Sequence, residues 1–399
     1  MSSVAHFYLF MGSGGVGKTT LSAAWALALA NRGLRVALIT IDPAKRLAQS
    51  LGLNQLAGHL TQTTISDHLW AMMLDQESTS HRLVERFAAH PHQAAKIIDN
   101  HYFKMFSRVL AGTQEMLAVY EVHEAIHSGR FDVVVLDTPP AQHALDFLEV
   151  PQRLSRALDG PALRWLIDQD DAAQKTKAGW RARLGGLGKN IALRAFTKVT
   201  SAPFIDDLLE FMGLFGGVLM QLRSRGVSLD HLLKSSSTDL WIITAPHQSQ
   251  LLAAQQVSEI LKERGYEVKG WLINRTPLVI CDSTRDPSDV AASPQLIDPD
   301  LLKALTGHVL EELATSTAWG HLSSAEAERL CAEVTRACRH EVYRGLTALS
   351  ALQTHLEEAN ARHLKLTLIE ELSQGLTPLE RIEQLAKILE RRSLVNHEV

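Results

Sequence analysis

A glycine-rich octapeptide near the amino end, residues 12–19, constrains this 399-residue chain more than any other feature. It reads Gly-Ser-Gly-Gly-Val-Gly-Lys-Thr and fits the pattern G-x-x-x-x-G-K-[ST]. An apolar run of strand length, residues 4–11, precedes it. A run rich in helix formers, residues 20–30, follows it and is closed by Gly33. The order strand, glycine loop, helix predicts a loop that binds phosphate at the edge of an α/β sheet.

Each residue type in the octapeptide has a chemical use. Glycines let backbone N–H groups approach phosphate oxygens without a Cβ in the way, and the following helix points its positive end at the same anion. We expect Lys18 to reach the β- and γ-phosphates of a nucleotide and the Thr19 hydroxyl to bind Mg²⁺ directly. The predicted phosphate-binding residues are Gly14, Gly15, Val16, Gly17, Lys18 and Thr19.

Composition narrows the class of protein. The net charge is −4, which gives no overall attraction to nucleic acid or acidic membranes, and a hydrophobic fraction of 46% supports a large core. The three cysteines, Cys281, Cys331 and Cys338, form no CxxC motif, so we expect a reducing, cytoplasmic location. Neither a secretory signal nor a run of about 18 apolar residues is visible.

Short apolar, β-branched runs alternate with helical patterns along the chain. This alternation predicts a doubly wound, mostly parallel α/β sheet of the P-loop type with helical insertions. The expected strands are residues 4–11, 34–41, 69–74, 131–136, 240–244, 268–274 and 364–369. We expect five parts: the first part of the sheet core (1–151), a helical insertion (152–237), two further core strands (238–275), a second helical segment (276–362), and a last core strand and C-terminal helix (363–399).

Two aspartates follow the carboxyl ends of predicted strands, where such sheets hold their ligands. Asp137 lies where an aspartate organises the Mg²⁺ shell in related nucleotide hydrolases. Asp42 has two interpretations: it caps the next helix, since Asp42-Pro43 favours a helix start, or it holds the attacking water near the γ-phosphate.

These segments resemble the ArsA-like family, the arsenical-pump and tail-anchored-protein-targeting ATPases. Residues 12–19 look like the family's deviant phosphate loop, and residues 40–44 look like its first switch. Residues 137–148, which begin Asp-Thr-Pro-Pro, look like its second switch. Asn274-Arg275, after a strand, looks like its adenine site.

The resemblance implies roles for individual residues. Asp42 would position or activate the hydrolytic water, and both Asp42 and Asp137 would contact Mg²⁺ through water. Thr20 would contact the α-phosphate, Asn274 and Arg275 would bind adenine, and His143 would relay the nucleotide state. It also implies ATP and Mg²⁺ as cofactors, a homodimer, and an ATP-hydrolysing switch whose helical segments handle a client such as a hydrophobic membrane-protein helix. The alternatives are an anion (arsenite) pump subunit and a regulatory ATPase that acts on a soluble protein.

Two departures from the family pattern bear on these roles. Ser13 stands where the family carries a lysine that reaches the partner's phosphates, and one hypothesis is that Lys45 or Arg46 replaces that charge. Both cations also fit ordinary solvated charges at a helix start. The absence of a CxxC and of clustered thiols disfavours arsenite transport.

Two other patterns compete for a function. His123-Glu124-Ala125-Ile126-His127 matches the H-E-x-x-H zinc-hydrolase motif, but no third ligand follows it. The apolar run 211–220 fits either the buried side of a helix or a groove for a client helix.

Overall fold

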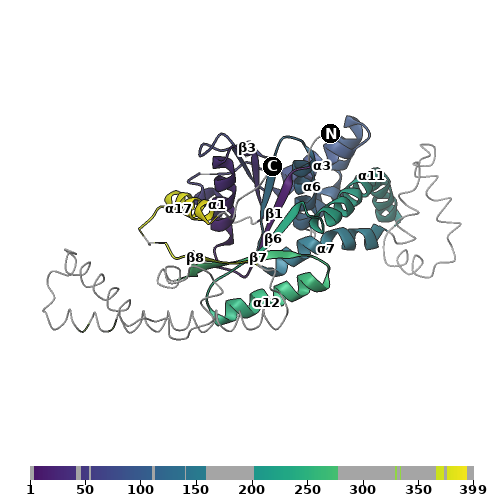
Figure 1. Cartoon of the computed structure of the whole chain (residues 1–399). Helices are drawn as coiled ribbons and strands as arrows, with labels where there is room; N and C mark the ends of the chain where they lie inside the picture. The colour runs from purple at the N-terminus through teal and green to yellow at the C-terminus, as the bar shows by residue number, and fades with distance from the viewer. Residues whose placement is uncertain are drawn as a thin grey trace. The chain divides into compact units, whose positions relative to one another are not determined.

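The structure is a computed structural model that describes residues 4–41, 46–53, 55–109, 113–139, 141–158, 202–276, 329, 333, 365–372 and 375–392 (Figure 1). The strands form one eight-stranded sheet in the order β3-β4-β2-β5-β1-β6-β7-β8. They are β1 (His6–Met11), β2 (Val36–Thr40), β3 (Thr61–Gln62), β4 (Leu69–Met73), β5 (Val133–Asp137), β6 (Thr238–Thr244), β7 (Val268–Thr276) and β8 (Lys365–Glu370).

The sheet confirms the predicted fold class. Strand β2 pairs in parallel with β4 and β5, and β7 pairs in parallel with β6 and β8. The short β3 is antiparallel to β4. All seven expected strands are present within a few residues of their predicted bounds, and the two-residue β3 is an addition that no apolar run announces.

The helices begin and end at residues suited to those positions. Asp75 caps the helix that starts at Gln76, where its carboxylate accepts a hydrogen bond from the Ser78 N–H (2.8 Å). Gly33, with φ +86°, follows the first helix as the sequence predicts. The described helices are α1 (Lys18–Asn31), α2 (Arg46–Ser50), α3 (Gln76–Phe87), α4 (Pro91–Asp99), α5 (His101–Val109), α6 (Thr113–His127), α7 (Ala141–Leu158), α11 (Ala202–Leu233), α12 (Gln248–Glu263) and α17 (Pro378–Arg391).

The chain divides into two compact units. The first comprises Met1–Tyr8 and Ala26–Thr238, and the second comprises Leu9–Trp25 and Asp239–Val399. The five-part division expected from the sequence stays a prediction. Helix α7 continues across residue 151, the predicted end of the first part.

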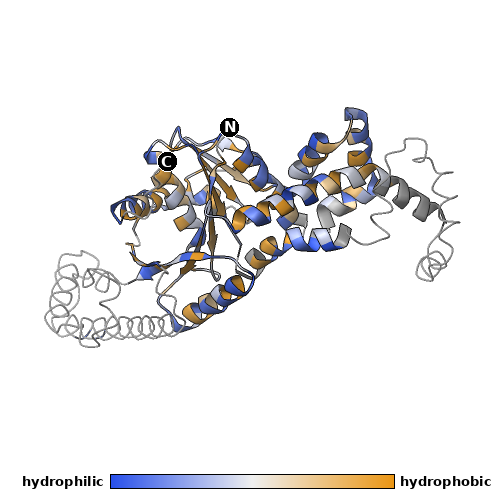
Figure 2. Ribbon diagram, turned by 45° about the vertical axis from the view of Figure 1, so that its right-hand side comes forward, coloured by the Kyte–Doolittle hydropathy of each residue, from blue (hydrophilic) through white to orange (hydrophobic). Residues whose placement is uncertain are grey.

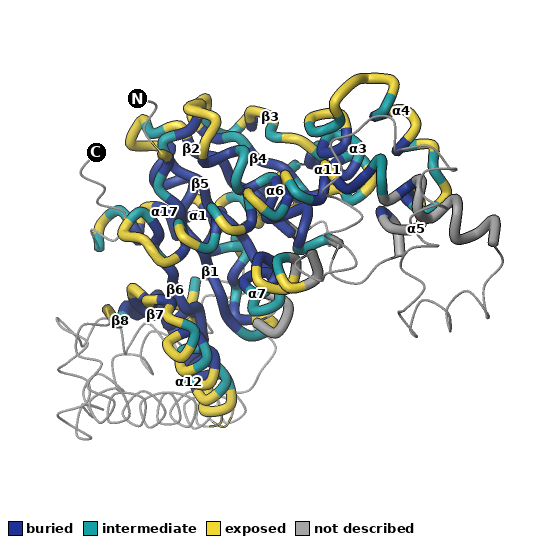
Figure 3. The backbone as a smooth tube through the Cα atoms, turned by 90° about the vertical axis from the view of Figure 1, so that its right-hand side faces the viewer, coloured by how far each residue is buried: buried dark blue, intermediate teal, exposed yellow. Residues whose placement is uncertain are grey.

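Within the first unit, strands β2, β4 and β5 are almost wholly buried, as the dark blue of Figure 3 shows. Helix α6 packs against α3, α7 and α11, and α3 also packs against α4 and α5. We call α3 to α7 together with α11 the helical cluster. Helix α6 is central in this cluster because, of its described side chains, only that of His127 is exposed. Figure 2 shows orange, hydrophobic residues and blue, hydrophilic residues along the helices of the structure.

Within the second unit, α12 and α17 lie on opposite sides of strands β6 to β8 (Figures 1 and 3). Trp25 of α1 contacts Phe10 of β1 and Trp241 of β6, each at a ring-centroid distance of 5.3 Å, so three aromatic rings pack together between these elements. Helix α17 begins with a capping box between Thr377 and Glu380.

Among the described residues, none of the helices combines the length and the apolar character that a bilayer crossing requires.

Candidate functional site

The glycine loop is fixed by close contacts of its backbone. A Cβ at Gly12 would lie 2.1 Å from the carbonyl oxygen of Ile243 in β6, so only glycine allows the loop to leave β1 at this distance. Gly17 has φ +90°, and a Cβ there would lie 2.4 Å from Nδ2 of Asn274. The pattern G-x-x-x-x-G thus corresponds here to two positions at which a side chain is sterically excluded.

Lys18 folds back over this loop. It is the first residue of α1 and only 7% exposed, and its ammonium donates to the carbonyls of Gly12 (3.0 Å) and Ser13 (2.8 Å). The first turn of α1 carries no acidic residue, so the positive end of the helix is not neutralised from within. Thr19 and Thr20 follow, both half-buried. The loop therefore gathers an ammonium group and a helix N-terminus in one place.

Ser13 occupies the position of the expected family lysine. Its Oγ is buried and has no hydrogen-bond partner among the described residues. A buried hydroxyl without a partner is uncommon in folded proteins. It fits a loop whose polar groups are completed by a ligand.

Asn274 contributes to the same loop from β7. It is 6% exposed, and its Nδ2 donates to the carbonyl oxygen of Val16 at 2.8 Å. The neighbouring Arg275 is exposed and has φ +56°, a left-handed conformation that is uncommon outside glycine. Of the pair expected at the adenine site, only Asn274 is held against the loop.

Asp137 lies in the first unit, at the end of β5. It is fully buried, and its Oδ2 accepts a hydrogen bond from the Thr40 hydroxyl at 3.0 Å. Thr40 and Asp137 are register partners on neighbouring parallel strands, and the Ile41 N–H donates to the Asp137 carbonyl (3.2 Å). Residues 40–41 and the end of β5 are thus joined by two hydrogen bonds.

Several expected site residues lie outside the described residues. These are Asp42, Lys45, and the side chains of Arg46 and His143. Their roles stay predictions. The three cysteines, to which no site role was assigned, also lie outside the described residues.

Gln114 was missed by the sequence analysis. It lies in the first turn of α6, and its side-chain amide donates to the carbonyl of Ile41, the residue before Asp42. No motif marks this glutamine, because the contact depends on how α6 packs. Thr40 lies in the expected first switch, residues 40–44, but its hydrogen bond to Asp137 was not predicted.

The residues of the H-E-x-x-H pattern contact one another and neighbouring helices. His123 and His127 stack on one face of α6 with ring centroids 4.1 Å apart, and His127 Nδ1 lies 2.9 Å from the His123 carbonyl oxygen. Glu124 pairs with Arg225 (3.1 Å), whose guanidinium lies 4.1 Å from the centre of the Phe87 ring. Among the described residues, no group of three His, Cys, Asp or Glu side chains is placed to hold a metal ion.

The apolar run 211–220 takes the buried form that the sequence analysis set beside a client groove. Phe211 and Phe215 stack with centroids 5.2 Å apart. Phe211 contacts Tyr102 (5.9 Å) and Phe215 contacts Phe103 (5.8 Å), both on α5. Helix α5 therefore covers the aromatic residues of α11 in this structure.

The known proteins that this chain resembles are ATPases, which agrees with a phosphate-binding loop. Residues 5–163 match the family model described as anion-transporting ATPase (ArsA_ATPase). The chain is 31% identical to ATPase GET3 of Mycosarcoma maydis over 152 residues, 38% of this chain and 44% of the relative. It is 33% identical to ATPase get3 of Schizosaccharomyces pombe over 151 residues, 37% of this chain and 44% of the relative. For ATPase get3 of Aspergillus terreus, the identity is 32% over 210 residues, 50% of this chain and 61% of the relative.

The matched part covers between 44% and 61% of the length of these three relatives. The family match includes the phosphate loop and Asp137, whereas Asn274 lies beyond it. Those two parts of the site therefore have support from the family match, and Asn274 rests on geometry alone.

Proposed function

Residues 5–163 of this chain belong to the ArsA-like family of ATPases, and from that premise we propose that the protein binds ATP with Mg²⁺ and hydrolyses its γ-phosphate. The observation that carries the proposal is the buried ammonium of Lys18 on the carbonyls of Gly12 and Ser13. A cation buried in a glycine loop at a helix N-terminus has a direct use as a ligand of a polyphosphate.

The residues present fit a bound nucleotide. Side chains are excluded at Gly12 and Gly17, the Ser13 Oγ is buried without a partner among the described residues, and the α1 N-terminus carries no acid. We propose that the amides of Gly14 to Lys18 bind the β-phosphate, that Thr20 contacts the α-phosphate, and that Asn274 and Arg275 contact the base. These assignments follow from what each group can donate or accept.

Mg²⁺, when bound, supplies positive charge to the β- and γ-phosphate oxygens. We propose that the Thr19 hydroxyl holds it directly and that Asp137 and Asp42 hold its water ligands. Asp137 suits this task because the Thr40 hydroxyl fixes its carboxylate in a buried position. Asp42 would in addition orient the attacking water as general base or positioning group.

The nucleotide state would reach the helical cluster through Ile41. The Ile41 carbonyl accepts from Gln114 at the start of α6, and α6 packs on α3, α7 and α11. We propose that a shift of the first switch moves α6, and that α5 then uncovers the aromatic residues of α11 for a hydrophobic helix of a membrane protein.

We also propose that the protein acts as a cytoplasmic homodimer. Sedimentation with ATP and with ADP tests the dimer.

Calorimetry and phosphate release test the ATPase proposal. With ample Mg²⁺, the wild type should bind ATP, Lys18→Ala should lower turnover by about 10²-fold or more, and Asp137→Asn should lower turnover while ATP still binds. Lys269→Ala is the matched control, because its exposed side chain lies 3.8 Å from Asp239 and away from the loop. No ATP heat in the wild type, or equal turnover in Lys18→Ala, would refute the proposal.

The client requires a separate measurement. A labelled transmembrane-helix peptide should bind in the ATP state and compete with a dye that reports exposed apolar surface. Binding of folded soluble proteins in place of the peptide would favour the regulatory alternative.

A further inference from the structure

Asn274 makes a contact that base recognition does not require. Its Nδ2 donates to the Val16 carbonyl at 2.8 Å, and both residues are buried. The two residues are 258 positions apart in the chain, so the bond ties the end of β7 to the middle of the phosphate loop.

The side chain of Asn274 occupies the space that a side chain at position 17 would need. The place where a Cβ of residue 17 would lie is 2.4 Å from the Asn274 Nδ2, and Gly17 has φ +90°. The Gly17 carbonyl also accepts the first helical hydrogen bond of α1, from the Leu21 N–H at 3.0 Å. Residues 16 and 17 are therefore fixed from the strand on one side and from the helix on the other.

The end of β7 departs from regular strand geometry at this point. The pairing of β7 with β8 shifts register between Ile273 and Thr276, and Arg275 between them has φ +56°. The Thr276 hydroxyl donates to the Ile273 carbonyl at 2.8 Å and closes the irregularity. Irregular strand ends of this kind commonly re-aim a side chain, and here the re-aimed side chain is Asn274.

We propose that Asn274 is a positioning residue of the phosphate loop, whether or not it also touches the base; this rests on the proposed nucleotide function. In a trans peptide, the C=O and the next N–H point in opposite directions. Because Asn274 holds the Val16 C=O toward β7, the Gly17 N–H points away from β7. That orientation is set before any ligand arrives, so the loop binds phosphate with less reorganisation.

Inorganic tripolyphosphate with Mg²⁺ separates this role from base recognition, because it has phosphates and no base. We expect Asn274→Ala to weaken ATP and tripolyphosphate by similar factors of about 10, the loss of roughly one hydrogen bond. Asn274→Asp keeps the shape, cannot donate, and should weaken both at least as much. Both variants should raise the KM for ATP more than they lower kcat. Unchanged tripolyphosphate affinity in either variant would overturn the proposal.

Two further measurements keep the outcome unambiguous. Amide exchange at residues 15–17 of the ligand-free protein should quicken in Asn274→Asp, while β6 and β7 keep their protection, which excludes general unfolding. Lys269→Ala on β7 is the control and should keep wild-type tripolyphosphate affinity. If the wild type bound neither ligand, the proposed function would fail. If Lys18→Ala lost tripolyphosphate and Asn274→Asp kept it, only the positioning role would fail.

Discussion

The phosphate loop and the helical cluster are held together by different kinds of contact. In the loop, side chains bind backbone: Lys18 donates to two carbonyls and Asn274 donates to a third. In the helical cluster, ion pairs between side chains join the helices: Arg82 pairs with Glu121 between α3 and α6, and Arg225 pairs with Glu124 between α11 and α6. A side-chain to backbone bond, from Gln93 of α4 to the Leu214 carbonyl of α11 (2.8 Å), accompanies them. The loop contacts fix peptide planes, whereas these ion pairs join the tips of long side chains.

This difference bears on which region can move. A peptide plane fixed from two sides has few alternatives, so the loop is set for its ligand beforehand. Long charged side chains and stacked rings can exchange neighbours when one helix slides on another. We therefore expect substitutions in the loop to affect ligand binding more than stability, and substitutions in the helical cluster to do the reverse.

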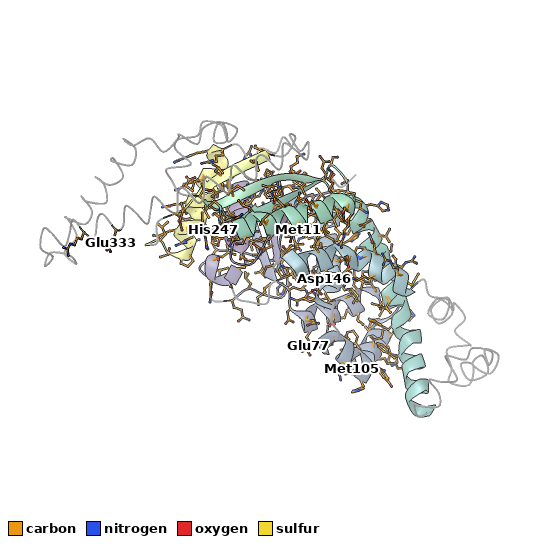
Figure 4. All side chains as sticks on the ribbon, turned by 90° about the horizontal axis from the view of Figure 1, so that it is seen from below. Met11, Glu77, Met105, Asp146, His247 and Glu333 are labelled. Carbon is orange, nitrogen blue, oxygen red and sulfur yellow. The ribbon has the colours of Figure 1, made fainter. Side chains whose placement is uncertain are left out.

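The largest expected effect on stability is that of Phe215→Ala in the helical cluster. Phe215 is 2% exposed and lies between Phe211 and Phe103, so its removal leaves a cavity among aromatic rings. We expect a loss of about 3–5 kcal/mol in the free energy of unfolding, measured by urea denaturation, with little change in ATP affinity. Met105→Ala on α5 (Figure 4) is the control; Met105 is 47% exposed, and the change should stay within about 0.5 kcal/mol. A Phe215→Ala protein of normal stability that lost ATP binding would reverse the comparison.

The next prediction compares alanine substitutions at two glycines that have similar φ angles. Gly17 (φ +90°) faces Asn274, whereas Gly33 (φ +86°) has no atom within 4 Å of its would-be Cβ among the described residues. Both alanine variants should cost about 1–2 kcal/mol of stability from the left-handed backbone. Only Gly17→Ala should abolish nucleotide binding, because its methyl group displaces the Asn274 amide. Thermal melts with and without ATP distinguish the two, and equal ATP-induced shifts would show that the loop tolerates a side chain.

The sequence predicts the structure of the phosphate loop better than that of the helical cluster. Residues 12–19 carry their geometry in local chemistry, since glycines, a lysine and a helix start specify a loop almost alone. The position of Asp137 at the end of a buried apolar strand was predictable for a similar reason, because a buried carboxylate needs a hydrogen-bond partner or a ligand. Parallel strands were predictable from uninterrupted apolar runs such as residues 133–136.

Contacts between distant elements were not predictable in the same way. Nothing in the sequence pairs Asn274 with Val16, or Gln114 with Ile41, because both bonds depend on the packing of elements far apart in the chain. The contacts of the H-E-x-x-H residues were unpredictable for a related reason. Periodicity puts both histidines on one face of α6, but only the fold shows that Arg225 approaches the glutamate between them.

His123 offers a test of the helical cluster through pH. Burial, then the nearby charges of His127 and Arg225, lower the pKa of His123 to about 3 from an ordinary value of 6.5. Its Nδ1 is buried without a hydrogen-bond partner among the described residues, 3.7 Å from the Glu124 carboxylate. Between these two pKa values the unfolded chain binds more protons, so stability is complete above pH 6.5 and falls as the pH drops toward 3.

The slope should be at most about 1.4 kcal/mol per pH unit for this one group. Urea denaturation of the wild type and of His123→Gln between pH 7 and pH 5 measures it. The glutamine variant should lose that share of the pH dependence. Parallel curves for the two proteins would show that His123 titrates in the folded state as it does in the unfolded chain.

The smallest expected effect on stability concerns the contact between the helical cluster and Ile41, the residue that follows β2. Gln114→Ala removes the donor to the Ile41 carbonyl and should cost about 1 kcal/mol of stability. Its larger consequence should be in hydrogen exchange. In the wild type, ATP should change the protection of α6 and α11, and in Gln114→Ala that change should shrink while ATP turnover continues. Gln221→Ala is the matched control, because Gln221 accepts from Arg225 at an exposed position on α11 and does not contact the strand ends. If the two variants kept the same ATP-dependent protection, α6 would not be the connection, and the helical cluster would have to respond through the second switch and α7.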